Sequence, residues 1–132
     1  MLVKSIANVP AEAVTMPGAS AVNMQMLLGP ADNCPNFAMR KFSVAPGGHT
    51  PRHQHNYEHE VLVLRGSGTA FSTAGEKRLT PGDVVYVPAN ELHQFSNTGN
   101  EPFEFICLVP AHVHRPGPAA AVTPAATAAG CS

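Results

Sequence analysis

Apolar residues occur along the chain in short runs in which they alternate with other side chains, and proline and glycine separate the runs. This alternation is typical of β-strands, because successive side chains of a strand point to opposite faces of the sheet. Short, evenly spaced strands with turn signals between them indicate an all-β sandwich or barrel. No window shows a helical period with caps. The expected strands cover residues 22–28, 37–45, 59–65, 68–73, 84–87, 92–96 and 103–109.

Two of these strands are apolar on both faces. The strand at 59–65 carries valines on the face of His59 and leucines on the opposite face, the face of Glu60. The strand at 103–109 alternates phenylalanine, Cys107 and valine with isoleucine and leucine. A small sandwich has few elements to cover both faces of a strand. We therefore expect a second copy of the chain to cover the outer face, which makes the protein a homodimer.

Length and charge restrict the classes of protein that the chain can belong to. Its 132 residues suit one domain with a real core. Charged residues make up only 13% of the chain and the net charge is −1, so no basic stripe is available to bind nucleic acid. No apolar run approaches the roughly 20 residues of a membrane helix. We find no signal peptide and no paired cysteines, and we expect a cytoplasmic protein.

The composition divides the chain into three parts. Residues 1–36 should form N-terminal strands and a dimerisation segment, and residues 37–112 should form the barrel core with its site. Residues 113–132 are rich in alanine and proline. Alanine buries too little surface to offset the entropy of ordering, so this part predicts a flexible tail. A packed C-terminal helix is the alternative.

Histidines are concentrated in the stretch PRHQHNYEHE, residues 51–60. His53 and His55 are two positions apart, so on an extended strand both rings point the same way. His59 has the same parity, and His93 belongs to a later strand that can pair near the first. Four neutral imidazoles that converge suit a divalent first-row metal. Two histidines in an H-x-H pattern on a strand are, by themselves, more often surface or hydrogen-bonded residues than metal ligands.

Two motifs surround these histidines. The first reads G-x5-H-x-H-x3-H-x6-G from Gly47 to Gly66, and the second reads G-x5-P-x-N-x2-H-x3-N from Gly82 to Asn97. Together they resemble the cupin superfamily, in particular the small single-domain bacterial (type-2) cupins with a four-histidine metal site. Asn90 stands where that pattern has glycine, and asparagine tolerates the positive φ of the turn.

The resemblance implies a fold, a site and partners. The fold is all-β, a single antiparallel cupin-type β-barrel (jelly roll), and the subunits form homodimers. The site holds one divalent transition metal per subunit, with manganese or iron as first candidates and copper, nickel or zinc as others. The family pattern has a glutamate where this chain has His59, and with a longer spacer Glu60 takes that place instead. The implied ligands are His53, His55, His59 and His93, with Glu60 as the alternative to His59.

Four imidazoles leave the double positive charge of the ion uncompensated, so the site should attract an anionic ligand. Two remaining coordination positions would let a small organic substrate chelate the metal. We therefore predict a metal-dependent oxidoreductase of dioxygenase type. The alternatives are a non-redox metal-dependent isomerase or lyase, and a non-catalytic cupin that binds a small molecule or a metal, because one fold hosts many activities.

Other inward-facing residues should surround the metal. Cys107 is either a small buried apolar residue or a thiol that lines the metal pocket. The second nitrogen of each ligand histidine needs a hydrogen-bond partner, for which the candidates are Gln54, Glu58, Glu60 and Asn97. His112 and His114 lie beyond the last strand and should be solvated. The expected pocket residues are Met39, Phe95, Phe103, Phe105 and Cys107.

Overall fold

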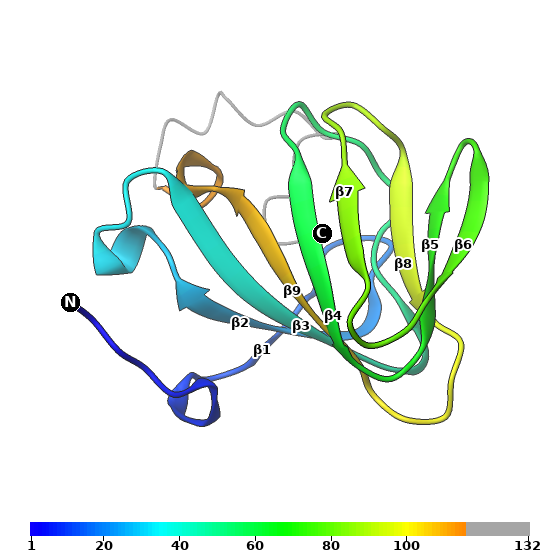
Figure 1. The fold of residues 1–132 in the computed structure, drawn as a ribbon, viewed down its shortest axis with the longest axis horizontal. Coiled ribbons are helices and arrows are strands. Elements are labelled where there is room, and N and C mark those ends of the chain that lie inside the picture. Colours follow the sequence, from blue (N-terminus) through cyan, green and yellow to red (C-terminus); the bar gives the residue numbers. More distant parts are fainter. Residues whose placement is uncertain (116–132) are drawn as a thin grey trace.

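The computed structural model describes residues 1–115, and most of them belong to one curled β-sheet (Figure 1). Its strands are β1 Glu12–Ala13, β2 Ser20–Leu28, β3 Phe37–His49, β4 His59–Arg65, β5 Gly68–Ser72, β6 Gly75–Leu79, β7 Val84–Val87, β8 His93–Asn97 and β9 Phe103–Pro110. Three short 3₁₀ turns are η1 Ile6–Asn8, η2 Pro30–Asp32 and η3 Ala111–His114. The strand order is β6-β5-β8-β3-β9-β4-β7, and β2 pairs with both β1 and β3.

The sheet curls until its two ends approach each other. A cavity of about 450 Å³ is lined by residues of β5 and β6 together with residues of β7, the strand at the other end of the order. In Figure 1, β7 lies on the same side of the molecule as the β5–β6 hairpin. Neighbouring strands pair antiparallel. The predicted all-β barrel is therefore confirmed.

The inner face of the sheet forms the core, as the alternation in the sequence predicts. In β9 every second residue, beginning with Phe103, is buried. The rings of Phe42, Phe95 and Phe103 all pack against Phe105, with centroids 5.5, 5.1 and 5.2 Å from its own. Burial of a phenylalanine contributes roughly 1.5–3 kcal/mol. This aromatic cluster fills the barrel next to the histidines.

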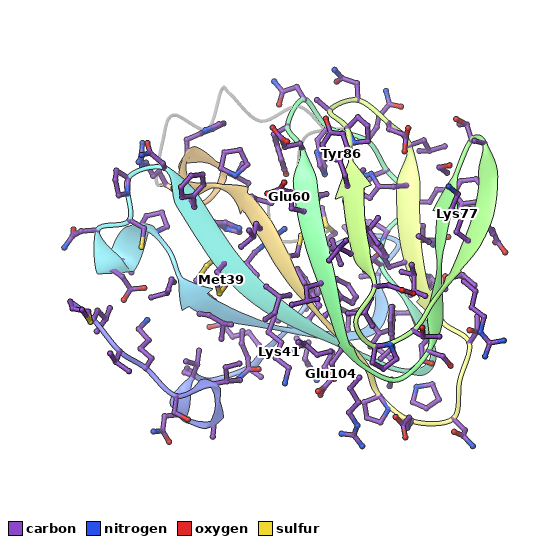
Figure 2. All side chains as sticks on the ribbon, viewed as in Figure 1. Met39, Lys41, Glu60, Lys77, Tyr86 and Glu104 are labelled. Carbon is purple, nitrogen blue, oxygen red and sulfur yellow. The ribbon has the colours of Figure 1, made fainter. Side chains whose placement is uncertain are left out.

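The sequence prediction missed β6. Residues Glu76, Lys77 and Arg78 of this strand are exposed, and only Leu79 is buried. Lys77 is labelled on this outer hairpin in Figure 2. An edge strand that carries charged side chains shows no apolar alternation, because it contributes little to the core. The pairing with β5 defines it instead.

The first residues that the sequence analysis assigned to the tail pack against the barrel. Val113 packs against the core, and the Arg115 guanidinium donates a hydrogen bond to the Pro35 carbonyl, so residues 113–115 belong to the fold. The rest of the predicted tail, and its helical alternative, lie outside the described residues. Within residues 1–115, none of the helical turns has the length and apolar character to cross a bilayer.

Gly66 provides a test of the packing at the end of β4. Its φ is +77°, and a Cβ added there would overlap the Pro102 carbonyl oxygen. Gly47 has a similar φ of +79° but open space around it. We expect Gly47→Ala to cost about 1–2 kcal/mol for the left-handed conformation alone, and Gly66→Ala to cost clearly more. Urea unfolding of both variants checks this, and equal losses would show that the overlap is relieved without cost.

Candidate metal centre

Backbone pairing between distant segments brings the histidines together. The amide of His53 donates to the His93 carbonyl over 3.1 Å, and the amide of His93 donates to the His53 carbonyl over 2.9 Å. Just before, the buried Thr50 exchanges hydrogen bonds with Phe95: its amide donates to the Phe95 carbonyl over 2.9 Å and its Oγ1 accepts from the Phe95 amide over 2.9 Å. The segment after β3 is thus fixed beside β8, with His53 opposite His93.

The turn of the second motif holds the loop that carries His55. Asn90 has a φ of +66°, and its amide donates to the His55 carbonyl over 2.7 Å. The expectation that asparagine can replace glycine in this turn is therefore confirmed. The ring of Tyr57 stacks on the His55 ring, with a centroid distance of 3.8 Å and planes 8° apart. These contacts fix the position of the His55 imidazole.

The ring nitrogens of three histidines lie close together, and the fourth histidine lies beside one of them. One nitrogen each of His53, His55 and His93 lies within 4.8 Å of the others. His59, the first residue of β4, has its Nε2 only 2.8 Å from the Nε2 of His55. Two nitrogens that bind one cation at about 2.0–2.1 Å and at right angles lie about 2.9 Å apart. The donor set and its spacing therefore fit a divalent transition metal.

The second nitrogens of three rings are held by the protein. Nδ1 of His55 lies 2.9 Å from the Tyr57 carbonyl oxygen, and Nδ1 of His93 lies 2.9 Å from the Glu91 carbonyl oxygen. Nδ1 of His59 lies 3.3 Å from Sγ of Cys107. Metal-binding histidines usually have such partners, which orient the ring and fix its tautomer.

These three partners differ from the side chains expected from the sequence, which were Gln54, Glu58, Glu60 and Asn97. Asn97 instead organises the turn after β8: its Nδ2 donates to the Val44 and Glu101 carbonyl oxygens, each over 2.8 Å. Two of the observed partners are main-chain carbonyls close in sequence to the histidine that they hold. Any residue type supplies a carbonyl, so the sequence pattern gave no signal for them.

Burial keeps the imidazoles neutral. Burial, followed by the nearby His93, lowers the pKa of His55 from 6.5 to about 4. Burial and then the charge of Arg40 hold the pKa of His59 far below its usual range. A neutral imidazole offers a lone pair to a cation, whereas a protonated one does not. At neutral pH both rings are therefore in the state that binds metal.

Arg40 is the functional candidate that the sequence reasoning missed. It lies in β3 directly opposite Cys107 of β9, and its side chain is fully buried. Its Nη2 lies 3.1 Å from Sγ of Cys107, and its guanidinium lies 4.9 Å from the centroid of the Phe42 ring. The sequence did contain a signal for Arg40. It alternates in step with Ala38 and Phe42, so all three side chains point to the inner face of the strand. A charged residue at an inward position of a strand is rare unless it has a partner.

His114 also differs from expectation. It was predicted to be solvated, yet its ring is partly buried, and burial followed by the charge of Arg40 lowers its pKa to about 4. His112, the other histidine of this H-x-H pair, is exposed as expected. The 3₁₀ turn η3, which the sequence analysis did not anticipate, accounts for the difference between the two.

The remaining predicted site residues divide into two groups. Phe95, Phe105 and Cys107 are fully buried near the histidines, with the Phe95 ring 6.3 Å from the His93 ring, and Phe103 lies behind Phe105. Met39 does not lie with the histidines. It lies on the outer side of β3 and lines a separate apolar cavity with Leu108.

Glu60, the alternative to His59, is also placed away from the site. Its side chain is exposed on the outer face of β4, next to Tyr86 of β7. Figure 2 labels Glu60 and Tyr86 on these neighbouring strands, and Met39 on β3.

Residues 40–109, which include all four histidines and both motifs, match the sequence family described as Cupin domain. The chain belongs to the cupin family. Among solved structures this cupin is similar to the polyketide cyclase RemF from Streptomyces resistomycificus. The identity is 30%, the match covers 84% of this chain and 80% of the cyclase, and the TM-score is 0.80.

Two curated relatives match over shorter segments. The 1-methylthio-D-xylulose 5-phosphate methylsulfurylase of Rhodospirillum rubrum is 35% identical over 78 residues, which is 59% of this cupin and 50% of the relative. The glucose-6-phosphate isomerase of Pyrococcus horikoshii is 42% identical over 55 residues, which is 38% of this cupin and 29% of the relative. The match thus spans 50% of the length of the first relative and 29% of the length of the second.

Proposed function

We propose that this cupin is a metal-dependent enzyme in which His53, His55, His59 and His93 hold one divalent transition metal. The observation that carries the proposal is the geometry of the nitrogens. The Nε2 atoms of His55 and His59 lie 2.8 Å apart in a buried site, and Nδ1 of each ring faces a protein group. When bound, the metal would supply Lewis acidity and positions for a chelating ligand.

Manganese or iron are the first candidates for the ion, with copper, nickel or zinc as others. Four imidazoles without a carboxylate suit first-row transition metals better than magnesium or calcium, which prefer oxygen ligands. Elemental analysis of protein purified without an affinity tag tests the identity of the ion. Protein without any stoichiometric metal, and unable to take one up, would contradict the proposal.

The charge of the site favours a small anionic substrate that binds through oxygen. Neutral histidines leave the charge of a divalent ion uncompensated, and the buried guanidinium of Arg40 adds a further positive charge beside Cys107 and His59. The aromatic rings of Phe95 and Phe105 would exclude water from the bound ligand. The residues of the barrel therefore suit a compact ligand with an anionic, oxygen-rich head and an apolar body.

For the reaction we favour non-redox chemistry, such as isomerisation, elimination or cyclisation. The relatives named above include an isomerase and a cyclase, and such reactions use a Lewis acid to stabilise an enolate or alkoxide. The dioxygenase activity predicted from the sequence stays a prediction, because the same four ligands can serve either chemistry. A binding protein without turnover is the remaining alternative.

One experiment separates the three possibilities. Metal-loaded protein is incubated with panels of hydroxy acids, sugar phosphates and phenolic enols, with and without dioxygen, and products are followed by mass spectrometry. Turnover without dioxygen supports the non-redox enzyme, and turnover only with dioxygen uptake supports the dioxygenase. Tight binding without turnover under both conditions would assign the chain to the binding proteins.

We also propose that the cupin forms a homodimer through its outer apolar face. Leu62 of β4 is 41% exposed and lies between Val84 of β7 and Ile106 of β9, and Val84 and Tyr86 are 78% and 62% exposed. Apolar surface of this kind is typical of an interface. We expect a dimer by sedimentation at micromolar concentration and a monomer for Leu62→Glu/Val84→Lys. A monomeric wild-type protein would contradict the dimer.

A further inference from the structure

Three buried side chains that contact one another in a row lie next to the candidate metal centre. Sγ of Cys107 is 3.1 Å from Nη2 of Arg40 and 3.3 Å from Nδ1 of His59. All three side chains are fully buried, and they come from β3, β9 and β4. Cross-strand register places Arg40 on one side of Cys107 and Val61, two residues after His59, on the other. The sulfur therefore connects a fixed hydrogen-bond donor to a ring that faces the centre.

The tautomer of His55 follows from its surroundings. Its Nδ1 faces the Tyr57 carbonyl oxygen, which can only accept a hydrogen bond. Its ring is buried and contacts the rings of His53, His59 and His93, an environment that favours the neutral imidazole. Nδ1 of His55 therefore carries the proton, and its Nε2 carries a lone pair that points at Nε2 of His59, 2.8 Å away.

Two lone pairs repel each other at 2.8 Å unless a cation or a proton lies between them. Without metal, Nε2 of His59 must therefore carry a proton and donate it to His55, which leaves a lone pair on Nδ1 of His59. With metal, Nε2 of His59 supplies a lone pair to the ion, and the proton of the neutral ring moves to Nδ1. The group that faces Nδ1 must donate in the first state and accept in the second.

A thiol can do both, since S–H is a weak donor and sulfur a weak acceptor. The sulfur of Cys107 also lies 3.9 Å from the Leu108 carbonyl oxygen, which can accept the S–H when it turns away from His59. The sulfur is fully buried, which disfavours a charged thiolate, so the thiol keeps its proton in both states. The guanidinium of Arg40 can only donate, so it holds the sulfur in place in both states.

We propose that Cys107 is a positioning residue that lets His59 exchange its two neutral tautomers when a metal binds, and that Arg40 anchors the sulfur for this role. The inference deepens the proposed function and rests on it. The proton balance is neutral: His59 loses a proton at Nε2 and gains one at Nδ1 through exchange with solvent, and Cys107 keeps its own. The alternative is that Cys107 has only a packing role in the core.

The first experiment reads the tautomers directly in the wild-type protein by ¹⁵N NMR of the histidine rings. After treatment with a chelator, we expect His59 protonated on Nε2 and His55 on Nδ1. After addition of Zn²⁺, we expect His59 protonated on Nδ1 and His55 unchanged. An unchanged tautomer of His59 in protein that binds Zn²⁺ would overturn this inference alone. Failure of the wild-type protein to bind Zn²⁺ would overturn both this inference and the proposed function.

The second experiment uses the sulfur position. Cys107→Ser keeps a group that donates and accepts, whereas Cys107→Val keeps a similar volume without either capacity. We expect Cys107→Val to weaken Zn²⁺ binding by roughly 10–100-fold in chelator competition, and Cys107→Ser to stay within a few-fold of the wild type. Cys34→Ser, which changes a cysteine away from the site, is the control. Equal Zn²⁺ affinity of the folded Cys107→Val and Cys107→Ser variants would overturn the inference. If Cys107→Val does not fold, the NMR experiment on the wild-type protein tests the inference.

Discussion

His59→Ala is expected to weaken metal binding by more than the roughly 10–100-fold that the loss of an outer contact causes, because it removes a ligand. His59 is fully buried with its Nε2 2.8 Å from that of His55, so the substitution removes a nitrogen donor from inside the site. Glu60→Ala should leave the affinity unchanged, since the Glu60 side chain is exposed on the opposite face of β4. Competition with a fluorescent chelator for Zn²⁺ or Mn²⁺ measures the metal affinity of both variants.

The exposed His112 provides the matched control, because His112→Ala removes a histidine away from the site. Retention of stoichiometric metal by His59→Ala together with its loss in Glu60→Ala would move the fourth ligand to Glu60. Loss of metal in His112→Ala would show that the binding measured is not that of the buried centre.

The metal-free protein is expected to lose stability steeply in mild acid. Burial lowers the pKa of His55 from 6.5 to about 4. Between these two pH values the unfolded chain binds a proton at His55, whereas the folded protein does not. The contribution of His55 is complete above pH 6.5 and is lost as the pH falls towards 4. His59 and His114, whose pKa values are also lowered by burial, act in the same direction.

Urea unfolding in the presence of a chelator, at a series of pH values from 7.5 down to 4, measures this dependence. His55→Gln should flatten the curve, because it removes one of the groups that the unfolded chain protonates. His112→Gln should keep the wild-type slope. A free energy of unfolding that is the same at pH 7.5 and pH 5 would contradict the burial of neutral histidines. Protons and metal compete for the same lone pairs of the histidines. We therefore expect the bound metal to be released as the pH falls.

The strands of the core could be predicted from the sequence because each shows period-2 alternation of apolar residues. In β9 the expected inward set of Phe103, Phe105, Cys107 and Val109 is buried. The edge strand β6 could not be found in this way, since its charged residues carry no information about which neighbour they pair with. Met39 was assigned to the cavity without regard to its parity, which places it on the outer side.

The sequence by itself determined the barrel, its inner face and the four histidines of matching spacing, because these features depend on local periodicity and on two short motifs. Only the tertiary structure decided that Arg40, Cys107 and His59 meet. That contact depends on the register of β3 and β4 against β9, and a shift of one residue would turn every side chain of a strand to the other face. Register is set by the packing of the whole barrel, so no single stretch of sequence contains it.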